Sequence, residues 1–375
     1  MNCRICDSAC FDKALLAYSG MPSSAQSFPE LGDLKDDIGS NLDVFQCSSC
    51  GLVQLNNIPV SYYKEVIRAS AFSEEMRGFR RIQFEDWIKQ YSLVGKKILE
   101  IGCGRGEYLS ILGKSDVLVH GVEYSEKAVE ACREQGYSVT KGFFGDSDLI
   151  LPEQKYDGFV CLSFMEHWPD PNKVLAHLSG CLVGNAVGLI EVPNFNMILE
   201  QRLFSEFISD HLMYFTQDTL TFALQLNGFE VVECSPVWHD YIISAVVKKR
   251  SRIDLTSFES QRLKLMKDLN EFIDRFGLDR VAVWGAGHQA LAVLSLASIG
   301  KRIKYVVDSA PFKQGKYTPA THIPILAPSQ LINDPVDAII IMAGSYSEEV
   351  VKIVRDNSSG EMKVAILRDY GLEIT

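Results

Sequence analysis

The middle of the chain contains residues suited to bind an adenosyl ligand. They are a strand, the glycine turn that follows it, and two acidic side chains. Residues 98–106 read Ile-Leu-Glu-Ile-Gly-Cys-Gly-Arg-Gly, and glycines at such a turn let the backbone approach a ligand closely. Glu100 can accept a hydrogen bond or balance a methionyl ammonium, and Glu123, about 20 residues later, can bind both hydroxyls of a ribose. Both acids would repel a pyrophosphate, and the turn lacks the lysine of a P-loop. The pattern therefore favours S-adenosylmethionine, which carries a cationic sulfur and no phosphate, over NAD or ATP.

Two further polar residues follow later strands of the same block. Asp146 comes after the third expected strand, where it either lies near the adenine or is a solvated loop acid. Ser163 begins the stretch Ser-Phe-Met-Glu-His-Trp after the fourth strand, at the carboxyl edge where such sheets bind ligands. The residues expected to bind the cofactor are Glu100, Gly102, Cys103, Gly104, Gly106, Glu123, Asp146 and Ser163.

Cysteines near the N-terminus form two pairs with the spacing of a zinc ribbon. The first pair is Cys3 and Cys6, and the second is Cys47 and Cys50. Four thiolates can close a tetrahedral shell around Zn²⁺ at about 2.3 Å and leave no open position, so the ion would be structural. The alternative is four unrelated buried thiols. The arrangement in two pairs favours metal ligands.

Runs of β-branched residues that alternate with helical patterns are expected to position these groups. Five runs predict a mostly parallel sheet with helices on both faces, an α/β fold, and they lie at residues 97–101, 117–122, 158–162, 187–192 and 242–247. A second, smaller α/β block has its runs at residues 281–284, 303–308, 338–342 and 363–367. The expected domains are a zinc-binding module (1–60), a helical connector (61–95), a cofactor-binding domain (96–250), a helical linker (251–277) and a C-terminal α/β domain (278–375).

Composition and charge exclude several classes of function. The 375 residues carry 37 basic and 48 acidic side chains, a formal net charge of −11, which argues against binding to nucleic acid or to an anionic membrane. No stretch approaches the roughly 20 apolar residues of a membrane-spanning helix. The first residues contain no apolar run, so we expect no signal peptide and a cytoplasmic location.

The glycine turn and the two acids resemble those of class I S-adenosylmethionine-dependent methyltransferases, over about residues 90–250. Across the whole chain, the order of a four-cysteine module, this fold and a second Rossmann-like α/β domain is similar to the nucleotide-sugar C-methyltransferases that act on 4-keto deoxysugars. The stretches that carry the resemblance lie at residues 47–55, continuing to Tyr62-Tyr63 and residues 70–73, at residues 209–216 (Ser-Asp-His-Leu-Met-Tyr-Phe-Thr), and at residues 307–325.

The resemblance implies roles for particular residues. In that family a histidine of the stretch at 209–216 removes the proton next to the ketone, and the matching residue is His211, preceded by Asp210 where the family usually has a glutamate. His167 matches a second active-site histidine. The resemblance further implies a nucleotide-sugar substrate bound in part by the C-terminal domain, and a monomer or weak homodimer. The residues expected to bind the substrate are Tyr63, Ser73, Tyr214, Gly287 and Lys313, the last of which is otherwise a solvated turn lysine.

One departure from the family leaves the chemistry open. Ile208 stands where the family commonly has a tyrosine, so the hydroxyl that would stabilise an enolate is missing or comes from elsewhere, with Tyr214 or Tyr63 as candidates. One alternative is therefore methylation of an oxygen or nitrogen of a sugar or another small metabolite. A second is a non-catalytic protein that binds a partner through its zinc module, and the intact glycine turn argues against it. A third is RNA methylation, which the net charge disfavours.

Overall fold

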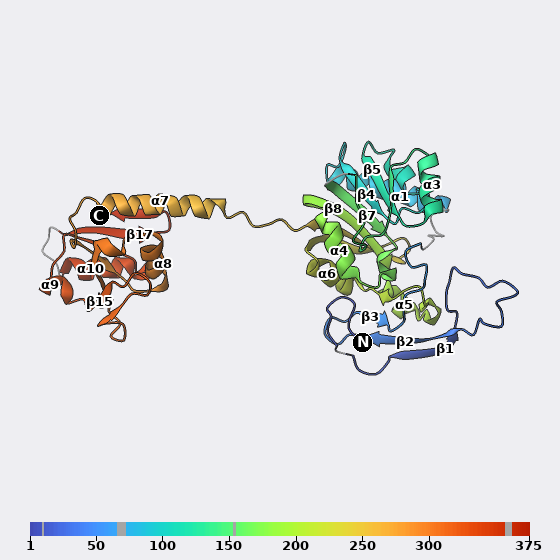
Figure 1. The fold of residues 1–375 in the computed structure, drawn as a ribbon, viewed down its shortest axis with the longest axis horizontal. Coiled ribbons are helices and arrows are strands. Elements are labelled where there is room, and N and C mark those ends of the chain that lie inside the picture. Colours follow the sequence, from blue (N-terminus) through green and yellow to red (C-terminus); the bar gives the residue numbers. More distant parts are fainter. Residues whose placement is uncertain (10, 66–72, 153–154, 357–361) are drawn as a thin grey trace. The chain divides into compact units, whose positions relative to one another are not determined.

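The structure is a computed structural model that describes residues 1–9, 11–65, 73–152, 155–356 and 362–375 (Figure 1). Cys10 and residues 70–72, part of a stretch that carries the family resemblance, lie outside the described residues. The chain forms two compact units, Met1–Arg252 and Ile253–Thr375, each described here by itself.

The central sheet of the first unit has seven strands in the order β10-β11-β8-β7-β4-β5-β6. Its strands are β4 (Lys97–Ile101), β5 (Leu118–Glu123), β6 (Val139–Lys141), β7 (Tyr156–Leu162), β8 (Leu182–Pro193), β10 (Phe229–Val237) and β11 (Ile242–Lys249). The five strands from β8 to β6 are parallel, whereas β11 runs antiparallel to β8 and β10. All five β-branched runs expected in this block are confirmed as strands.

Helices cover both faces of this sheet. The helices are α1 (Glu74–Gln90), α2 (Leu109–Leu112), α3 (Glu126–Glu134), α4 (Pro171–Gly180), α5 (Phe195–Gln201) and α6 (Gln217–Leu226), with 3₁₀ turns η2 (Met165–His167) and η3 (Phe204–Glu206). On one face, Phe84 and Trp87 of α1 pack against Val160 of β7. On the other face, residues of α4 and α6 such as Leu175 and Leu220 form the core with the alternate side chains of the strands. The parallel strands thus all direct their carboxyl ends to one sheet edge, where ligands bind in such folds.

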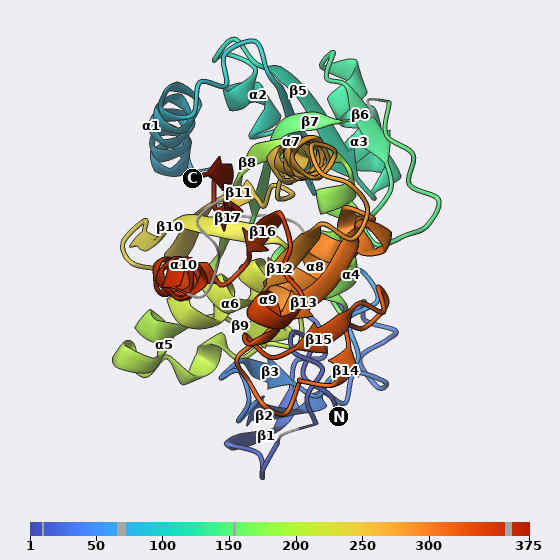
Figure 2. The ribbon, with the colours of Figure 1, turned by 90° about the vertical axis from the view of Figure 1, so that its left-hand side faces the viewer.

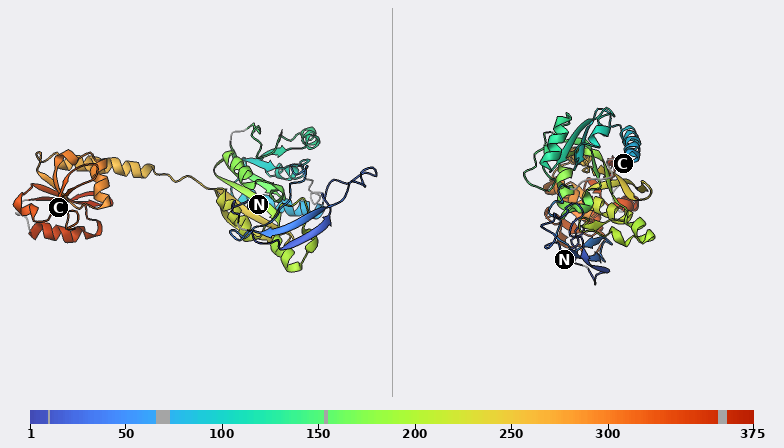
Figure 3. Two further views of the ribbon diagram at one scale, coloured as in Figure 1. Left: turned by 60° about the horizontal axis from the view of Figure 1, so that its bottom comes forward. Right: turned by 90° about the vertical axis from the view of Figure 1, so that its right-hand side faces the viewer.

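A smaller antiparallel sheet joins the N-terminal segment to the middle of the chain. Its strands are β1 (Leu16–Met21), β2 (Ser40–Gln46), β3 (Val53–Leu55) and β9 (Met213–Tyr214), in the order β1-β2-β3-β9. Val53 pairs with Tyr214, and the Leu55 amide donates to the carbonyl of Leu212 at 3.0 Å. Figure 3 shows these N-terminal strands within the first unit. The cysteine-bearing segment therefore fixes the backbone beside His211.

The second unit is a second α/β sheet with helices on both faces (Figures 2 and 3). Its sheet order is β14-β15-β13-β12-β16-β17-β18. The strands are β12 (Val281–Trp284), β13 (Ile303–Val307), β14 (Lys316–Tyr317), β15 (Pro324–Leu326), β16 (Ala338–Ile341), β17 (Lys363–Arg368) and β18 (Gly371–Ile374). The helices are α7 (Thr256–Ile273), α8 (His288–Leu296), α9 (Gln330–Asn333) and α10 (Ser347–Asp356), with 3₁₀ turns η4 (Gly300–Arg302) and η5 (Gly344–Tyr346). The four expected runs of this block are confirmed as strands.

Among the described residues, every helix is too short or too polar to cross a lipid bilayer.

Candidate active site

The glycine turn after β4 is held against the neighbouring strand β5. The amides of Gly102 and Cys103 both donate to the carbonyl of Val122, at 2.8 and 3.1 Å. Gly102 has a φ of +66°, and a Cβ atom added there would lie 2.8 Å from Cδ1 of Phe164. Both the left-handed backbone and the close ring require glycine at this position. The turn therefore presents bare backbone at the sheet edge.

Glu123 at the end of β5 is bound to the same turn. One carboxylate oxygen accepts from the Gly104 amide at 2.9 Å, and the other accepts from the amides of Tyr124 and Ser125 at 2.9 Å. Since these amides fix the carboxylate beside the turn, its remaining acceptor capacity is directed to the position that a ribose takes in such folds.

A small cavity of about 10 Å³ lies at this edge of the sheet. Its lining residues are Lys64, Ile101, Gly102, Val122, Glu123, Tyr124, Gly142, Phe143, Phe144 and Phe164. Two of the predicted cofactor residues are therefore in its wall. Glu100 and Cys103 are buried beside the turn, and Gly106, with a φ of +89°, continues it.

The other predicted cofactor residues border this region. Asp146 forms an ion pair with Lys64, whose Nζ lies 2.8 Å from Oδ2 of the carboxylate. Ser163, with a φ of +50°, follows β7 and precedes Phe164, and its amide donates to the Glu191 carbonyl at 2.8 Å. The donor set fits an adenosyl group with a charged methionyl end: acids for the ribose, aromatic rings for the base and bare backbone at the turn.

His167 and His211 lie side by side at the carboxyl edge of the sheet. Their ring centroids are 4.8 Å apart. Nδ1 of His167 lies 2.7 Å from the carbonyl oxygen of Asp210, which fixes the orientation of that ring, and the Leu212 amide donates to the Glu166 carbonyl at 2.9 Å. The ring of Phe164 lies 6.4 Å from that of His167. Because Phe164 also covers Gly102, the two histidines are next to the cofactor turn.

Burial keeps both imidazoles neutral. Desolvation lowers the pKa of His167 to about 4, opposed by its hydrogen bond to the Asp210 backbone. Burial, and secondarily the neighbouring His167, hold the pKa of His211 well below its usual 6.5. A neutral imidazole at pH 7 has a free nitrogen lone pair with which to accept a proton.

Asp210 connects the histidines to the N-terminal segment. Its Oδ2 accepts from the Tyr62 hydroxyl at 2.7 Å, and its Oδ1 accepts from the Ala25 amide at 2.8 Å. The Tyr62 hydroxyl in turn accepts from the Gln26 amide at 3.1 Å. Sequence reasoning assigned no role to Tyr62, because its partner Asp210 lies far along the chain. Its place in the Tyr62-Tyr63 stretch that carries the family resemblance was the available signal.

The predicted substrate residues of the first unit have different surroundings. Tyr63 packs edge-on against Phe143 with ring centroids 5.6 Å apart, at the cofactor cavity. Ser73 caps α1, since its side chain accepts from the Met76 amide at 3.4 Å. Tyr214 is buried, and its hydroxyl accepts from the Ile208 amide at 3.0 Å. The Tyr214 hydroxyl is thus engaged with backbone, whereas Tyr62 presents a hydroxyl at Asp210.

Gly287 and Lys313 lie at the corresponding sheet edge of the second unit. Gly287 is the N-cap of α8, and a Cβ atom there would meet no neighbour within 4 Å. Asp308, at the end of β13, accepts from the Ala286 amide and from Lys313 Nζ, both at 2.8 Å. This repeats the pattern of Glu123 and Gly104, an acid that holds a glycine turn.

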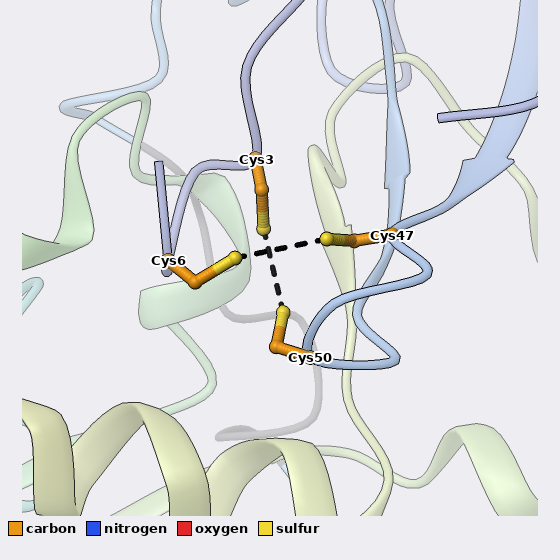
Figure 4. A group of neighbouring side chains, drawn as sticks. All are labelled: Cys3, Cys6, Cys47 and Cys50. Carbon is orange, nitrogen blue, oxygen red and sulfur yellow. Dashed lines mark hydrogen bonds between the residues drawn. The ribbon is translucent and has the colours of Figure 1, made fainter. Parts of the chain in front are cut away.

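The four N-terminal cysteines converge on one point (Figure 4). Cys3 Sγ lies 3.5 Å from Cys50 Sγ, and Cys6 Sγ lies 3.7 Å from Cys47 Sγ. A regular tetrahedron with bonds of about 2.3 Å places its sulfurs about 3.8 Å apart. The donor set and its spacing therefore fit a structural zinc ion.

A second group of potential ligands lies at the histidine pair. Glu166, His167 and His211 bring one ligand atom each within 4.8 Å of one another. A cation at this position would bind nitrogen lone pairs that proton abstraction needs, so the two uses exclude each other.

Comparison with known proteins agrees with the two units. Residues 76–234 match the methyltransferase domain family, and residues 250–366 match the C-methyltransferase C-terminal domain family. The chain is 23% identical over 363 residues to the C-methyltransferase NovU of Streptomyces niveus, which covers 86% of this chain and 85% of that protein. It is also 33% identical over 91 residues to a ubiquinone biosynthesis O-methyltransferase of Thiobacillus denitrificans, covering 22% of this chain and 38% of that protein.

Solved methyltransferase structures match parts of the chain. One is magnesium protoporphyrin IX methyltransferase from Synechocystis PCC 6803 with bound SAH, at a TM-score of 0.40, 15% identity, 51% of this chain and 91% of that one. Another is the putative methyltransferase complexed with the Haloferax volcanii Trm112 activator, at a TM-score of 0.39, 15% identity, 49% of this chain and 100% of the matched chain.

The fold, the glycine turn and the matched domains define a class I S-adenosylmethionine-dependent methyltransferase. The chain also carries a C-methyltransferase C-terminal domain and is similar over most of its length to the C-methyltransferase NovU.

Proposed function

We propose that this enzyme methylates a carbon next to the keto group of a nucleotide-linked 4-keto deoxysugar. The observation that carries the proposal is the pair of neutral histidines, His167 buried and His211 half-buried, beside the glycine turn, with Asp210 and Tyr62 hydrogen-bonded next to it. Such a cluster supplies a base for a carbon acid.

His211 is the proposed base. Its neutral nitrogen accepts the proton from the carbon beside the ketone, and the electron pair of that C–H bond moves to give an enolate. His167, held by the Asp210 carbonyl at 2.7 Å, positions His211 and the substrate. The Tyr62 hydroxyl gives its one proton to Asp210 Oδ2 at 2.7 Å, so its proposed role is to orient Asp210 beside His167.

The remaining roles concern binding. S-adenosylmethionine supplies an electrophilic methyl group when bound. The proposed cofactor residues Glu100, Gly102, Gly104 and Glu123 orient it at the sheet edge, and Phe164 lies between this turn and the histidines. In the second unit, we assign the substrate diphosphate to the backbone at Gly287, the N-cap of α8, and to Lys313, whose ammonium lies 2.8 Å from Asp308 and offsets the charge of that carboxylate.

We further propose that the four cysteines bind one structural zinc ion. The ion would fix the turn at Cys47 and Cys50, which leads directly into β3 and hence to β9 and His211. Zinc would then support the geometry of the active site without taking part in the reaction.

A Cys50→Ser variant is expected to lower zinc content from about one ion per chain toward zero and to lower the melting temperature, because one of four ligands is lost. Elemental analysis and thermal denaturation of the purified protein measure both effects. Cys234→Ser, at a partly buried cysteine outside the cluster, is the matched control and should retain its zinc. Equal zinc content in the two variants would contradict the assignment.

Methylation of oxygen is the second candidate function. It is favoured by Ile208 in place of a tyrosine and by the local similarity to O-methyltransferases. An oxygen nucleophile needs a base but no enolate, so the histidine pair alone would suffice.

The position of the transferred methyl group separates the two functions. The enzyme is incubated with a panel of nucleotide 4-keto sugars and methyl-¹³C-labelled cofactor, and products are analysed by mass spectrometry and NMR. The proposal predicts a product in which the labelled methyl is bonded to carbon beside the ketone. A labelled methoxy or N-methyl group would contradict it.

A further inference from the structure

Lys64 lines the small cavity at the sheet edge and brings its charged end to the side chains around it. Its Nζ lies 2.9 and 2.8 Å from the two carboxylate oxygens of Asp146. The same ammonium lies 4.9 Å from the ring centroid of Tyr124 and 5.2 Å from that of Phe143, within the range of cation–π contacts. The side chain is 20% exposed, so the ammonium is largely enclosed by these three groups.

In the proposed cofactor site, an adenine would lie next to these three partners. Tyr124 directly follows Glu123, whose carboxylate is fixed beside the glycine turn. A ribose at Glu123 would therefore place its base toward Tyr124, Phe143 and Asp146, two aromatic faces and a hydrogen-bond acceptor. A flat purine and the Lys64 ammonium cannot both contact the same faces. The open volume of the cavity, about 10 Å³, is too small for a purine while Lys64 is in place.

We propose that Lys64 acts as a plug of the adenine pocket, and that an adenosyl ligand binds only after the Lys64–Asp146 ion pair opens. This inference rests on the proposed cofactor site and goes beyond it, because it makes Lys64 a residue that weakens cofactor binding. In the opposite role, Lys64 contacts the ligand and strengthens binding. That role starts from the same contacts of Lys64, but it predicts that removal of the lysine weakens cofactor binding.

Lys64 belongs to a short segment that also contacts the proposed substrate site. Tyr62, two residues earlier, donates to Asp210, and Tyr63 packs against Phe143. The short segment 62–64 therefore contacts the proposed substrate site at one end and the adenine pocket at the other. Release of Lys64 by the cofactor would act on the backbone that carries Tyr62.

Calorimetric titration of the full chain with S-adenosylhomocysteine tests the plug. Lys64→Met removes the charge but keeps an unbranched side chain. This variant should bind S-adenosylhomocysteine about three- to tenfold more tightly, because the ligand no longer has to break a partly exposed ion pair and its cation–π contacts. Lys64→Arg retains the charge and should bind within about twofold of the wild-type chain. Lys141→Met, which removes the exposed pair with Glu126, is the matched control and should leave affinity unchanged.

The outcomes are distinguishable. Unchanged or weaker binding by Lys64→Met, with wild-type binding intact, would overturn the plug and leave the cofactor site standing. If neither the wild-type chain nor Lys64→Met bound the ligand, the cofactor site itself would be refuted, and the plug with it. Circular dichroism of each variant confirms that the fold is retained.

Discussion

A His211→Asn variant should bind S-adenosylhomocysteine as the wild-type chain does and lose about 10²- to 10⁴-fold in turnover. The amide keeps a polar side chain of similar size but cannot accept a proton at neutral pH. Since His211 lies beside the cofactor turn but contributes no contact to Glu123 or Gly104, cofactor affinity should not change. Steady-state kinetics with the keto-sugar substrate and calorimetry with the cofactor product measure the two effects separately.

His239→Asn is the matched control for this experiment. His239 is exposed and pairs with Glu75 at 3.1 Å, outside the cluster, so its loss should leave turnover unchanged. Retained turnover in His211→Asn would exclude His211 as the base. Equal losses in both variants would indicate general destabilisation and would contradict a specific role.

A Gly102→Val variant should lose cofactor binding by about a hundredfold or more. The φ of +66° is strained for a β-branched residue, and the new Cβ would lie 2.8 Å from the Phe164 ring, so the turn and the ring must shift. Because Phe164 separates the turn from the histidines, turnover should fall as well. The dissociation constant for S-adenosylhomocysteine, measured by calorimetry, is the direct readout.

Gly184→Val provides the comparison. Gly184 is an exposed position in β8, and a Cβ atom there meets no neighbour within 4 Å, so the substitution should leave binding unchanged. Binding by Gly102→Val within a few-fold of the wild-type chain would show that the cofactor does not lie on this turn.

The strands were predictable from sequence because they are buried on both faces. The run of β16, Ala-Ile-Ile-Ile, is continuously apolar and rich in β-branched residues, which is the pattern of a parallel strand between two helix layers. The short strands β6 and β14 have two or three residues each and no such pattern, so they were missed. The helix α2 begins only at Leu109, since Glu107 is still part of the turn and accepts from the Arg105 amide.

The parts of the site that sequence reasoning missed are contacts between distant segments. The pairing of β3 with β9 places the cysteine-bearing segment beside His211, and nothing in the spacing of either segment specifies the other as its partner. The same holds for Tyr62 with Asp210 and for Lys64 with Asp146. By contrast, the proximity of Glu123 to the glycine turn follows from strand order, because parallel neighbours end at the same edge.

Exchange of the substrate proton with solvent tests enolisation most directly. In D₂O, without S-adenosylmethionine, the wild-type enzyme should incorporate deuterium at the carbon beside the keto group of the nucleotide sugar, as followed by NMR, and His211→Asn should not. Absence of exchange with the wild-type enzyme on a sugar that it methylates, or undiminished exchange with His211→Asn, would contradict the account.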